Sequence, residues 1–370
     1  INGIEHEVDY SYDKKNRIWQ VLLYGNMEHD GTVLAEYEYY EDDRIKYIDF
    51  ANNTRTRYFY DNAGRLDYIE HSNKTSGVSF YVNNLTLDNR GNIIKSDEFL
   101  PEIEPEIPDN GFKQSSSNTY SYNDNNHAIT IAGVSHTIND DGNTTNISNN
   151  TSINYDIDDR LISYADIDNN LAFKYNPYNQ RVEANRNGVI TKYIRDVITD
   201  NVLVALDENN NPTYYYIYNG NGTLIARMNP QGELQYYHAD VRGSTIAITD
   251  DNADILHTYR YDDFGTITNS YEPDNDFNPY RYVGTYGVEY ELNDLYYMRA
   301  RYYKPSVGRF LTEDPIWSTN LYPYADNNPI SRIDPLGEEG VSVFIETDRL
   351  GHVYIDVNET IFSYGRYGET

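Results

Sequence analysis

The sequence contains no cysteine, and it is poor in tryptophan, methionine and basic residues. Its 370 residues include 2 Trp, 3 Met and 29 Lys or Arg against 59 Asp or Glu, for a formal net charge of −30 at pH 7. Without cysteine there is neither a disulfide framework nor a thiolate metal site. Such an excess of negative charge repels phosphate backbones and anionic lipid headgroups, so we expect neither nucleic acid nor a membrane surface as a partner.

Long apolar runs are also missing. No stretch approaches the roughly 20 apolar residues that a membrane-spanning helix needs, so we expect no membrane insertion by this segment. No basic-then-apolar signal segment opens at Ile1. The sequence instead begins in the middle of a repeat pattern, and we expect a fragment whose export signals, if it has any, lie upstream.

Tyrosine is the residue in excess. The chain has 40 tyrosines and a mean hydropathy of −0.75. Tyrosine favours strands, and it combines a large apolar ring with a hydroxyl that can reach water or a partner. A chain this polar cannot build a thick apolar core, so the composition favours thin β-sheet over a helical bundle.

An internal repeat runs along the chain: a strand ending in Tyr-Asp, a turn, and a second strand that begins with an aliphatic residue. The clearest copy is Tyr58-Phe-Tyr-Asp-Asn-Ala-Gly-Arg-Leu66. Weaker copies lie at Tyr10–Ile18, Tyr39–Ile45, Leu87–Ile93, Tyr155–Leu161, Tyr175–Val182, Tyr218–Leu224 and Tyr261–Ile267. Each copy reads as a β-hairpin, because Asp or Asn opens a turn and Gly or Asn accepts positive φ.

A single hairpin of this kind buries one face and is unstable alone, so neighbouring hairpins must stack. A long strip of twisted hairpins curls. We therefore predict an all-β fold in which the hairpins spiral into a hollow shell. A flat β-solenoid or a set of sandwiches remains the alternative.

Two segments interrupt the repeat, and one pair of residues invites a metal interpretation. Residues 101–119 are rich in proline and acid and predict a loop, whereas residues 136–152 predict a polar hairpin. His238 and Asp240 lie close together, but no third ligand has a fitting spacing. We expect strand residues that bond a neighbouring turn, and no metal or cofactor.

The most informative stretch is residues 290–337, which holds two Asp-Pro steps behind a run of Tyr and Arg. The steps are Asp314-Pro315 and Asp334-Pro335. Two carboxylates held close together cannot both ionise cheaply, so one keeps a proton and acts as an acid while the other acts as a base. The alternative is a pair of solvated Asp-Pro turns.

The order of motifs in this stretch resembles the core signature of the RHS (rearrangement hotspot)/YD-repeat proteins. The matching residues are Tyr302-Tyr303-Lys-Pro305, Gly308-Arg-Phe-Leu311, Glu313-Asp-Pro315, Asn320-Leu-Tyr-Pro-Tyr324, Asn328-Pro-Ile330 and Asp334-Pro-Leu-Gly337. The resemblance implies the C-terminal part of a secreted or injected bacterial toxin. In that family a hollow β-shell carries a variable C-terminal toxin, with the core segment folded inward as a plug.

The resemblance also implies self-cleavage by aspartate chemistry just after the second motif, a single-turnover autoprotease activity at most. It assigns Asp314 and Asp334 as the acid–base pair, with Arg301 and Arg309 as the arginines that steady the carboxylates or polarise the scissile carbonyl and Arg299 behind them. The cleavage region is Leu336, Gly337, Glu338 and Glu339.

The match departs from the family pattern at three points. Trp317 stands where the family most often has Gly, the span from Asp314 to Asp334 is 20 residues and shorter than usual, and Glu338 follows Gly337 where cleavable members usually show Leu. A folded core that does not cleave therefore stays open as an alternative.

These features divide the chain into three expected parts. Residues 1–289 form the YD-repeat shell, residues 290–337 the core with the cleavage site, and residues 338–370 the partial start of the toxin, read as three strands with a turn at 349–351. His352 reads as a structural or surface residue.

The expected partners are the chain's own C-terminal toxin as cargo, and other shell or capping subunits or a secretion component. An adhesive, carbohydrate-binding YD-repeat surface protein without proteolysis is the alternative function.

Overall fold

The computed structural model describes residues 6–25, 31–88, 93–99, 120–122, 128–131, 134–148, 150–273, 276–316, 320–338, 341–344, 354–357 and 360–363. Within these ranges the fold is β-sheet with three short 3-10 turns, η1 (Gly284–Tyr286), η2 (Pro305–Val307) and η3 (Tyr324–Asn327). None of the described helices is long and apolar enough to cross a membrane. The all-β prediction is confirmed.

The first wall of the molecule is an 8-stranded antiparallel sheet in which each strand pairs with the next one in sequence. Its strands are β1 (His6–Tyr12), β2 (Ile18–Gly25), β3 (Thr32–Tyr39), β4 (Ile45–Phe50), β5 (Thr54–Tyr60), β6 (Leu66–Asn73), β7 (Ser79–Leu87) and β8 (Ile93–Phe99). Short strands follow: β9 (Tyr120–Tyr122), β10 (Ala128–Ile131), β11 (Val134–Ser135), β12 (Thr137–Ile138) and β13 (Thr144–Asn146). The antiparallel pair β12–β13 is the polar hairpin predicted within residues 136–152, whereas the predicted loop at 101–119 lies outside the described residues.

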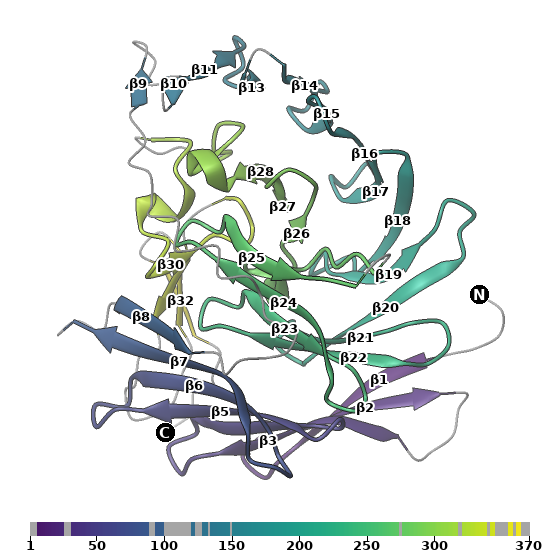
Figure 1. The fold of residues 1–370 in the computed structure, drawn as a ribbon, viewed down its shortest axis with the longest axis vertical. Helices are drawn as coiled ribbons and strands as arrows, with labels where there is room; N and C mark the ends of the chain where they lie inside the picture. The colour runs from purple at the N-terminus through teal and green to yellow at the C-terminus, as the bar shows by residue number, and fades with distance from the viewer. Residues whose placement is uncertain are drawn as a thin grey trace.

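The second wall is a 12-stranded sheet, again in sequence order. Its strands are β14 (Ser152–Tyr155), β15 (Leu161–Ala165), β16 (Asn170–Tyr175), β17 (Arg181–Arg186), β18 (Val189–Arg195), β19 (Val202–Leu206), β20 (Pro212–Tyr218), β21 (Leu224–Met228), β22 (Leu234–Ala239), β23 (Thr245–Thr249), β24 (Ile255–Tyr261) and β25 (Ile267–Tyr271). The strip of hairpins curves round the molecule (Figure 1), as expected for a twisted strip.

The aspartate of the repeat closes each turn with its own side chain. In the unit that begins at Tyr60, Asp61 Oδ1 accepts hydrogen bonds from the backbone N–H groups of Ala63 and Arg65, both at 2.9 Å, and Oδ2 accepts from Arg65 Nε at 2.8 Å. Gly64 has φ 81°, a conformation that L side chains rarely adopt. The side chain thus replaces the ladder bonds that the chain loses where it reverses.

The same pair of bonds, to the N–H groups two and four residues on, recurs along both walls. It is made by Asp13, Asp156, Asn176, Asp207, Asn219, Asn229, Asp240, Asp250 and Asp262. The turns at Asp207, Asn229 and Asp250 connect the hairpins to one another and lack the preceding tyrosine, so the repeat pattern alone did not reveal them.

The tyrosine of the repeat ties each hairpin to the one before it. Its hydroxyl donates to the backbone carbonyl of the first residue on the returning strand of the preceding hairpin. The pairs are Tyr39 to Ile18, Tyr60 to Ile45, Tyr155 to Thr144, Tyr175 to Leu161, Tyr218 to Val202 and Tyr261 to Thr245, at 2.7 to 3.0 Å. These bonds fix the stacking of hairpins along the strip.

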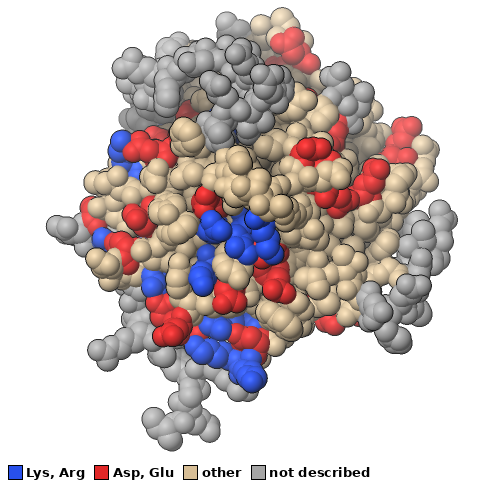
Figure 2. All heavy atoms as spheres, turned by 60° about the horizontal axis from the view of Figure 1, so that its bottom comes forward, with Lys and Arg blue, Asp and Glu red and all other residues tan. Residues whose placement is uncertain are grey.

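The two walls meet through apolar side chains and a few long-range hydrogen bonds. Ile18 and Val21 of the first sheet share one buried cluster with Ile217 and Tyr236 of the second. The turn ahead of β21 reaches the first sheet, because Tyr10 donates to the carbonyl of Tyr218 at 3.0 Å. One outer face carries basic groups set among acidic ones (Figure 2). Ion pairs within the first sheet and its turns include Arg55–Asp49, Lys74–Asp49 and Arg57–Glu70.

The C-terminal core lies inside the curve of the walls (Figure 1). It contains a 4-stranded sheet of β26 (Glu289–Tyr290), β27 (Tyr296–Met298), β28 (Arg301–Lys304) and β29 (Arg309–Phe310). A second 4-stranded sheet joins β30 (Arg332–Ile333) to β31 (Val341–Phe344), β32 (Tyr354–Val357) and β33 (Thr360–Ser363). The core folds inward as predicted, and the three strands expected after Gly337 are present, whereas the turn at 349–351 and His352 lie outside the described residues.

Charge as well as apolar packing attaches the core to the wall. Arg181 of β17 is 0% exposed and bonds Glu289 at 2.6 Å and Glu291 at 2.5 Å. Arg195 also contacts Glu289, and Arg186 contacts Glu291 at 2.6 Å. Burial raises the pKa of Glu289, but the charges of Arg181 and Arg195 outweigh it and lower that pKa to about 2. Glu289 is therefore an ionised partner in a buried network of paired charges.

Replacing Tyr39 by Phe should lower the free energy of unfolding by about 1 kcal/mol, because the carbonyl of Ile18 loses its hydroxyl partner. Chemical denaturation followed by circular dichroism measures this change. Tyr12→Phe is the matched control: Tyr12 is 51% exposed, and its hydroxyl has no recorded hydrogen bond within the described part of the chain. Equal effects of the two substitutions would contradict the role given to the buried hydroxyl.

Candidate functional site

The two predicted aspartates meet on one arginine. Arg301, the first residue of β28, is 2% exposed, and its Nη2 contacts Asp314 Oδ2 at 2.6 Å and Asp334 Oδ2 at 3.3 Å. Asp334 is 1% exposed and the Asp314 side chain 12%. Residues that lie 20 positions apart in the sequence thus form one buried pair, and the alternative of two solvated Asp-Pro turns does not describe them.

The same guanidinium also holds the segment that follows the second motif. Arg301 Nε donates to the carbonyl of Gly337, and Nη1 donates to the carbonyl of Leu321 at 2.9 Å. The guanidinium lies over the ring of Phe310, 3.7 Å from its centroid. These contacts leave Arg301 little freedom, so it is a rigid donor set facing both carboxylates and two peptide carbonyls.

The backbone after Asp334 is folded tightly against the tip of the β27–β28 hairpin. Asp334 Oδ1 accepts from the N–H of Gly337 at 2.8 Å and of Glu338 at 3.3 Å. The N–H of Ala300 donates to the carbonyl of Leu336 at 3.1 Å. A Cβ on Gly337 would lie 2.5 Å from the carbonyl oxygen of Met298, and its φ is 66°, so only glycine fits.

Burial changes the acidity of the pair. Burial raises the pKa of Asp334 to about 7; the Arg301 charge opposes this rise, and the Asp314 carboxylate adds to it. Burial also lowers the pKa of Arg301, against the effect of both aspartates. Near neutral pH the site can therefore hold one proton on Asp334 beside the Asp314 carboxylate, an arrangement suited to acid–base work.

The other predicted residues lie around this centre. Arg309 donates to Asn320 at 3.2 Å and stands over the Tyr322 ring, so it braces the segment after the first motif. Leu336 and Glu338 are exposed, whereas Trp317 and Glu339 lie outside the described residues.

Sequence reasoning missed one residue of the site and assigned another to a different task. The Tyr324 hydroxyl accepts from the N–H of Asp334 at 3.4 Å; Tyr324 belongs to the core signature, but no role in the site was assigned to it. Arg299 contacts the backbone near the second motif rather than a carboxylate of the pair: it donates to the carbonyl of Pro335 at 3.3 Å.

The pair His238 and Asp240 is structural. His238 Nε2 bonds Thr249 Oγ1 of the neighbouring strand at 2.9 Å, and Asp240 closes its own turn. In the part of the chain that the structure describes, no group of three or more His, Cys, Asp or Glu side chains could hold a metal ion.

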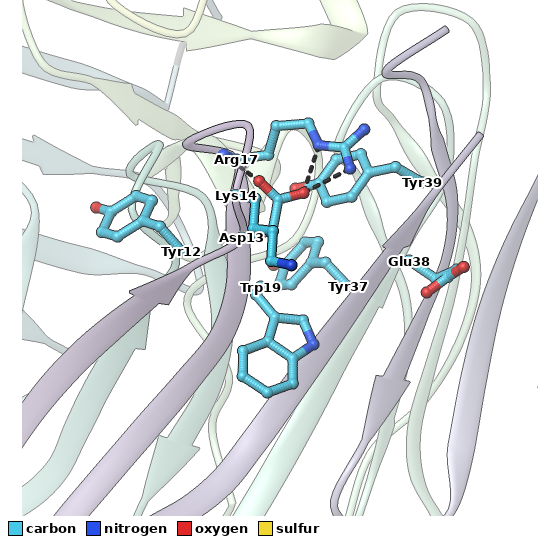
Figure 3. A pocket seen from close by; sticks show the side chains of 8 residues that line it. All are labelled: Tyr12, Asp13, Lys14, Arg17, Trp19, Tyr37, Glu38 and Tyr39. Atoms are coloured by element: carbon cyan, nitrogen blue, oxygen red, sulfur yellow. Dashed lines mark hydrogen bonds and ion pairs between the residues drawn. The ribbon is translucent and has the colours of Figure 1, made fainter. Parts of the chain in front are cut away.

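A surface pocket, separate from the aspartate pair, lies at the turn end of strands β1, β2 and β3 (Figure 3). This cavity of about 390 Å³ is lined by Tyr12, Asp13, Lys14, Arg17, Trp19, Tyr37, Glu38 and Tyr39. Asp13 and Arg17 bond each other within it, and Trp19 is 45% exposed. It is an aromatic surface pocket that contains none of the residues of the aspartate pair.

Comparison with known proteins agrees with the fold. The Teneurin YD-shell family matches residues 108–330, more than half of the chain. The chain belongs to this family of YD-repeat β-shells.

Curated relatives match shorter stretches. The tRNA3(Ser)-specific nuclease WapA of Bacillus spizizenii is 36% identical over 173 residues, 45% of this chain and 7% of the relative. The toxin protein Tse5 of Pseudomonas aeruginosa is 30% identical over 110 residues, 29% of this chain and 8% of the relative. The chain thus spans a small fraction of the length of these relatives.

Solved structures share the fold at low sequence identity. The crystal structure of TcdB2-TccC3-Cdc42 superposes with a TM-score of 0.67 and 15% identity, covering 90% of this chain and 20% of that one. The Photorhabdus luminescens Tc holotoxin pore gives a TM-score of 0.65 and 14% identity, covering 97% and 21%. The family match, the relatives and these superpositions together support the RHS/YD-repeat shell that the repeat and the core signature predicted.

The raised pKa of Asp334 predicts a pH-dependent stability. An unfolded aspartate ionises near pH 3.9, so between that pH and about 7 unfolding releases a proton, and stability falls as the pH rises through this window. The loss should be on the order of 4 kcal/mol. Chemical denaturation at pH 5 and pH 8 measures the part of this loss that lies above pH 5, about 3 kcal/mol. Asp334→Asn should remove this slope, whereas Asp168→Asn, an exposed turn residue, should keep it; identical slopes in all three proteins would be evidence against the assignment.

Proposed function

We propose that this chain is part of a toxin-encapsulating shell and that its core cuts the chain after Gly337 to release a C-terminal effector. The observation that carries the proposal is the contact of one guanidinium, that of Arg301, with Asp314, Asp334 and the Gly337 carbonyl. Relatives named as a nuclease and a toxin support an effector as cargo. The wall, the inward core and the released segment would be residues 1–289, 290–337 and 338–370.

The geometry favours the Gly337–Glu338 peptide bond. Arg301 Nε polarises the Gly337 carbonyl and would stabilise the negative charge that develops on its oxygen. The nitrogen of Glu338, the leaving group of this bond, lies 3.3 Å from Asp334 Oδ1. In the structure this N–H donates to Oδ1; once water has added to the carbonyl carbon, the nitrogen becomes pyramidal and its lone pair can take a proton from Asp334 at the same short range.

The proposed reaction is hydrolysis with one water molecule. Ionised Asp314 takes a proton from water while the water oxygen bonds to the carbonyl carbon of Gly337. Protonated Asp334 then gives its proton to the Glu338 nitrogen as the C–N bond breaks. The products are a Gly337 carboxyl group, which loses its proton to solvent, and a new amino terminus at Glu338; Asp314 is left protonated and Asp334 ionised. Arg309 would support this centre by holding the segment that follows Asp314.

The setting of this function would be an exported bacterial protein, and no cofactor enters the reaction. Other shell subunits or a component of a secretion machine would complete the compartment. The superposition with multi-subunit toxin assemblies supports this setting through the shared fold.

The alternative is an adhesive or carbohydrate-binding YD-repeat surface protein without proteolysis. The exposed Trp19 beside the 390 Å³ pocket favours it. Against it, tyrosines dominate the largest fully buried side chains, among them Tyr164, Tyr236 and Tyr303, so these rings are packed and unavailable as a binding face. Binding of oligosaccharides by the wild type and loss of binding in Trp19→Ala would support adhesion.

Intact mass spectrometry of the purified chain tests cleavage directly. Wild type should convert to fragments ending at Gly337 and beginning at Glu338. Asp314→Asn and Asp334→Asn should each slow conversion by about 10²–10⁴-fold, since each removes one proton-transfer group. Asp168→Asn should convert like wild type. A single full-length species that persists in wild type, as in both active-site variants, would refute the proposal.

The rate of cleavage should depend on pH in one direction above neutrality. Asp334 must carry a proton to act as the acid, and its pKa is raised to about 7, so the rate should fall as the pH rises beyond that value. Conversion followed by mass from pH 5 to pH 9 measures the profile. A rate that keeps rising to pH 9 would mean that Asp334 is not the acid.

A further inference from the structure

Arg299 joins the cleavage segment to the wall. It occupies the tip between β27 and β28 with φ 53°, a strained conformation for a residue other than glycine. Its Nη1 donates to the carbonyl of Pro335 at 3.3 Å, and its Nη2 donates to Asn201 Oδ1 at 2.9 Å. One guanidinium therefore spans a wall residue and the second Asp-Pro motif.

Asn201 is itself a junction between two turns of the wall. It is 6% exposed and follows the turn at Asp196 that joins β18 to β19. Its Nδ2 donates to the carbonyl of Gly222, in the turn between β20 and β21, at 3.3 Å. The Asn201 side chain therefore links Arg299 to the turn of the adjacent hairpin.

The contact between Arg299 and Asn201 is closely packed against the backbone of Gly287. A Cβ at Gly287 would lie 2.6 Å from Arg299 Nη2 and 3.1 Å from Asn201 Oδ1, and Gly287 has φ 89°. The glycine lets the core backbone press against the guanidinium and the amide at once. A side chain there would push Arg299 off one of its two partners.

We propose that Arg299 is a positioning residue, held by Asn201, that makes cleavage depend on the stacking of the adjacent wall hairpins β18–β19 and β20–β21. This inference rests on the proposed function. With the carbonyl of Pro335 fixed by Arg299 and that of Leu336 fixed by Ala300, the Gly337 carbonyl is placed on Arg301 Nε. If the wall turns separate, Asn201 moves away, Arg299 loses its anchor, and the segment drifts from the aspartate pair.

The recorded contacts of Arg299 distinguish this role from catalysis. They involve a wall amide and the carbonyl two residues before Gly337, not the carboxylates or the bond to be cut. Small misplacements of reacting groups can cost about 10²-fold in rate. Loss of the anchor should therefore slow cleavage without changing which groups donate and accept protons.

Four variants test the coupling. Asn201→Ala and Arg299→Lys should each slow fragment formation about 10-fold or more. The shape of the rate profile against pH should stay as in wild type, because the aspartate pair is untouched. The double variant should be no slower than the slower single variant, since both remove one shared contact. Asn211→Ala, an exposed asparagine at the end of another wall turn, should cleave like wild type.

Rates within twofold of wild type, or losses that multiply in the double variant, would overturn the coupling. A thermal melt of each variant distinguishes loss of the anchor from a general loss of folding. A general loss of folding would lower the melting temperature and leave the cleavage rate of the folded fraction unchanged. Among these variants, Arg299→Lys separates charge from geometry, because lysine keeps the positive charge but cannot bond Pro335 and Asn201 through two guanidinium nitrogens.

A measurement independent of cleavage keeps the inference separate from the proposed function. In the Asp314→Asn background, hydrogen–deuterium exchange at Ala300 and Gly337 should be about 10-fold faster with Asn201→Ala added and unchanged with Asn211→Ala added. If wild type never cleaves, the proposed function fails, but the exchange rates still show whether the contact between Arg299 and Asn201 holds the segment in place. Equal exchange in both variants would overturn it.

Discussion

The structure depends on the tyrosine–aspartate turn. The carboxylate of Asp61 bonds two backbone N–H groups of its own turn, and the hydroxyl of Tyr60 bonds the carbonyl of Ile45 in the preceding hairpin. The first contact closes a hairpin, and the second stacks it. Repeated along the strip, these contacts let a chain with a mean hydropathy of −0.75 build a wall without a thick apolar core.

Inside the wall, buried ion pairs help to hold the core in place, because the chain has few aliphatic side chains. Arg181, Glu289 and Glu291 are almost wholly buried, and each is paired. A buried charge is costly unless its partners are well placed, so these pairs tolerate little displacement of the core against the wall. The same intolerance suits a reaction site, because Arg301 must hold Asp314 and Asp334 at fixed distances.

Much of this site could be predicted because its motifs are local. The roles of Asp314, Asp334 and Arg301 followed from the resemblance to the RHS core signature, and the structure brings these residues together. Asn201 could not be found in this way, since nothing in its own segment distinguishes it from other turn asparagines. The resemblance placed Arg299 behind Arg301, but it could not show that Arg299 contacts a carbonyl whereas Arg301 contacts two carboxylates.

The sequence by itself determined the β-hairpins, their turns and the all-β class, because tyrosine, aspartate and glycine act through bonds within a few residues. Only the tertiary structure decided which residues share a buried site and which carbonyl faces the guanidinium. Those choices depend on contacts between segments far apart in the chain, such as that of Arg299 with Asn201. The raised pKa of Asp334 was also decided by the tertiary structure, since its main cause is burial rather than neighbours in sequence.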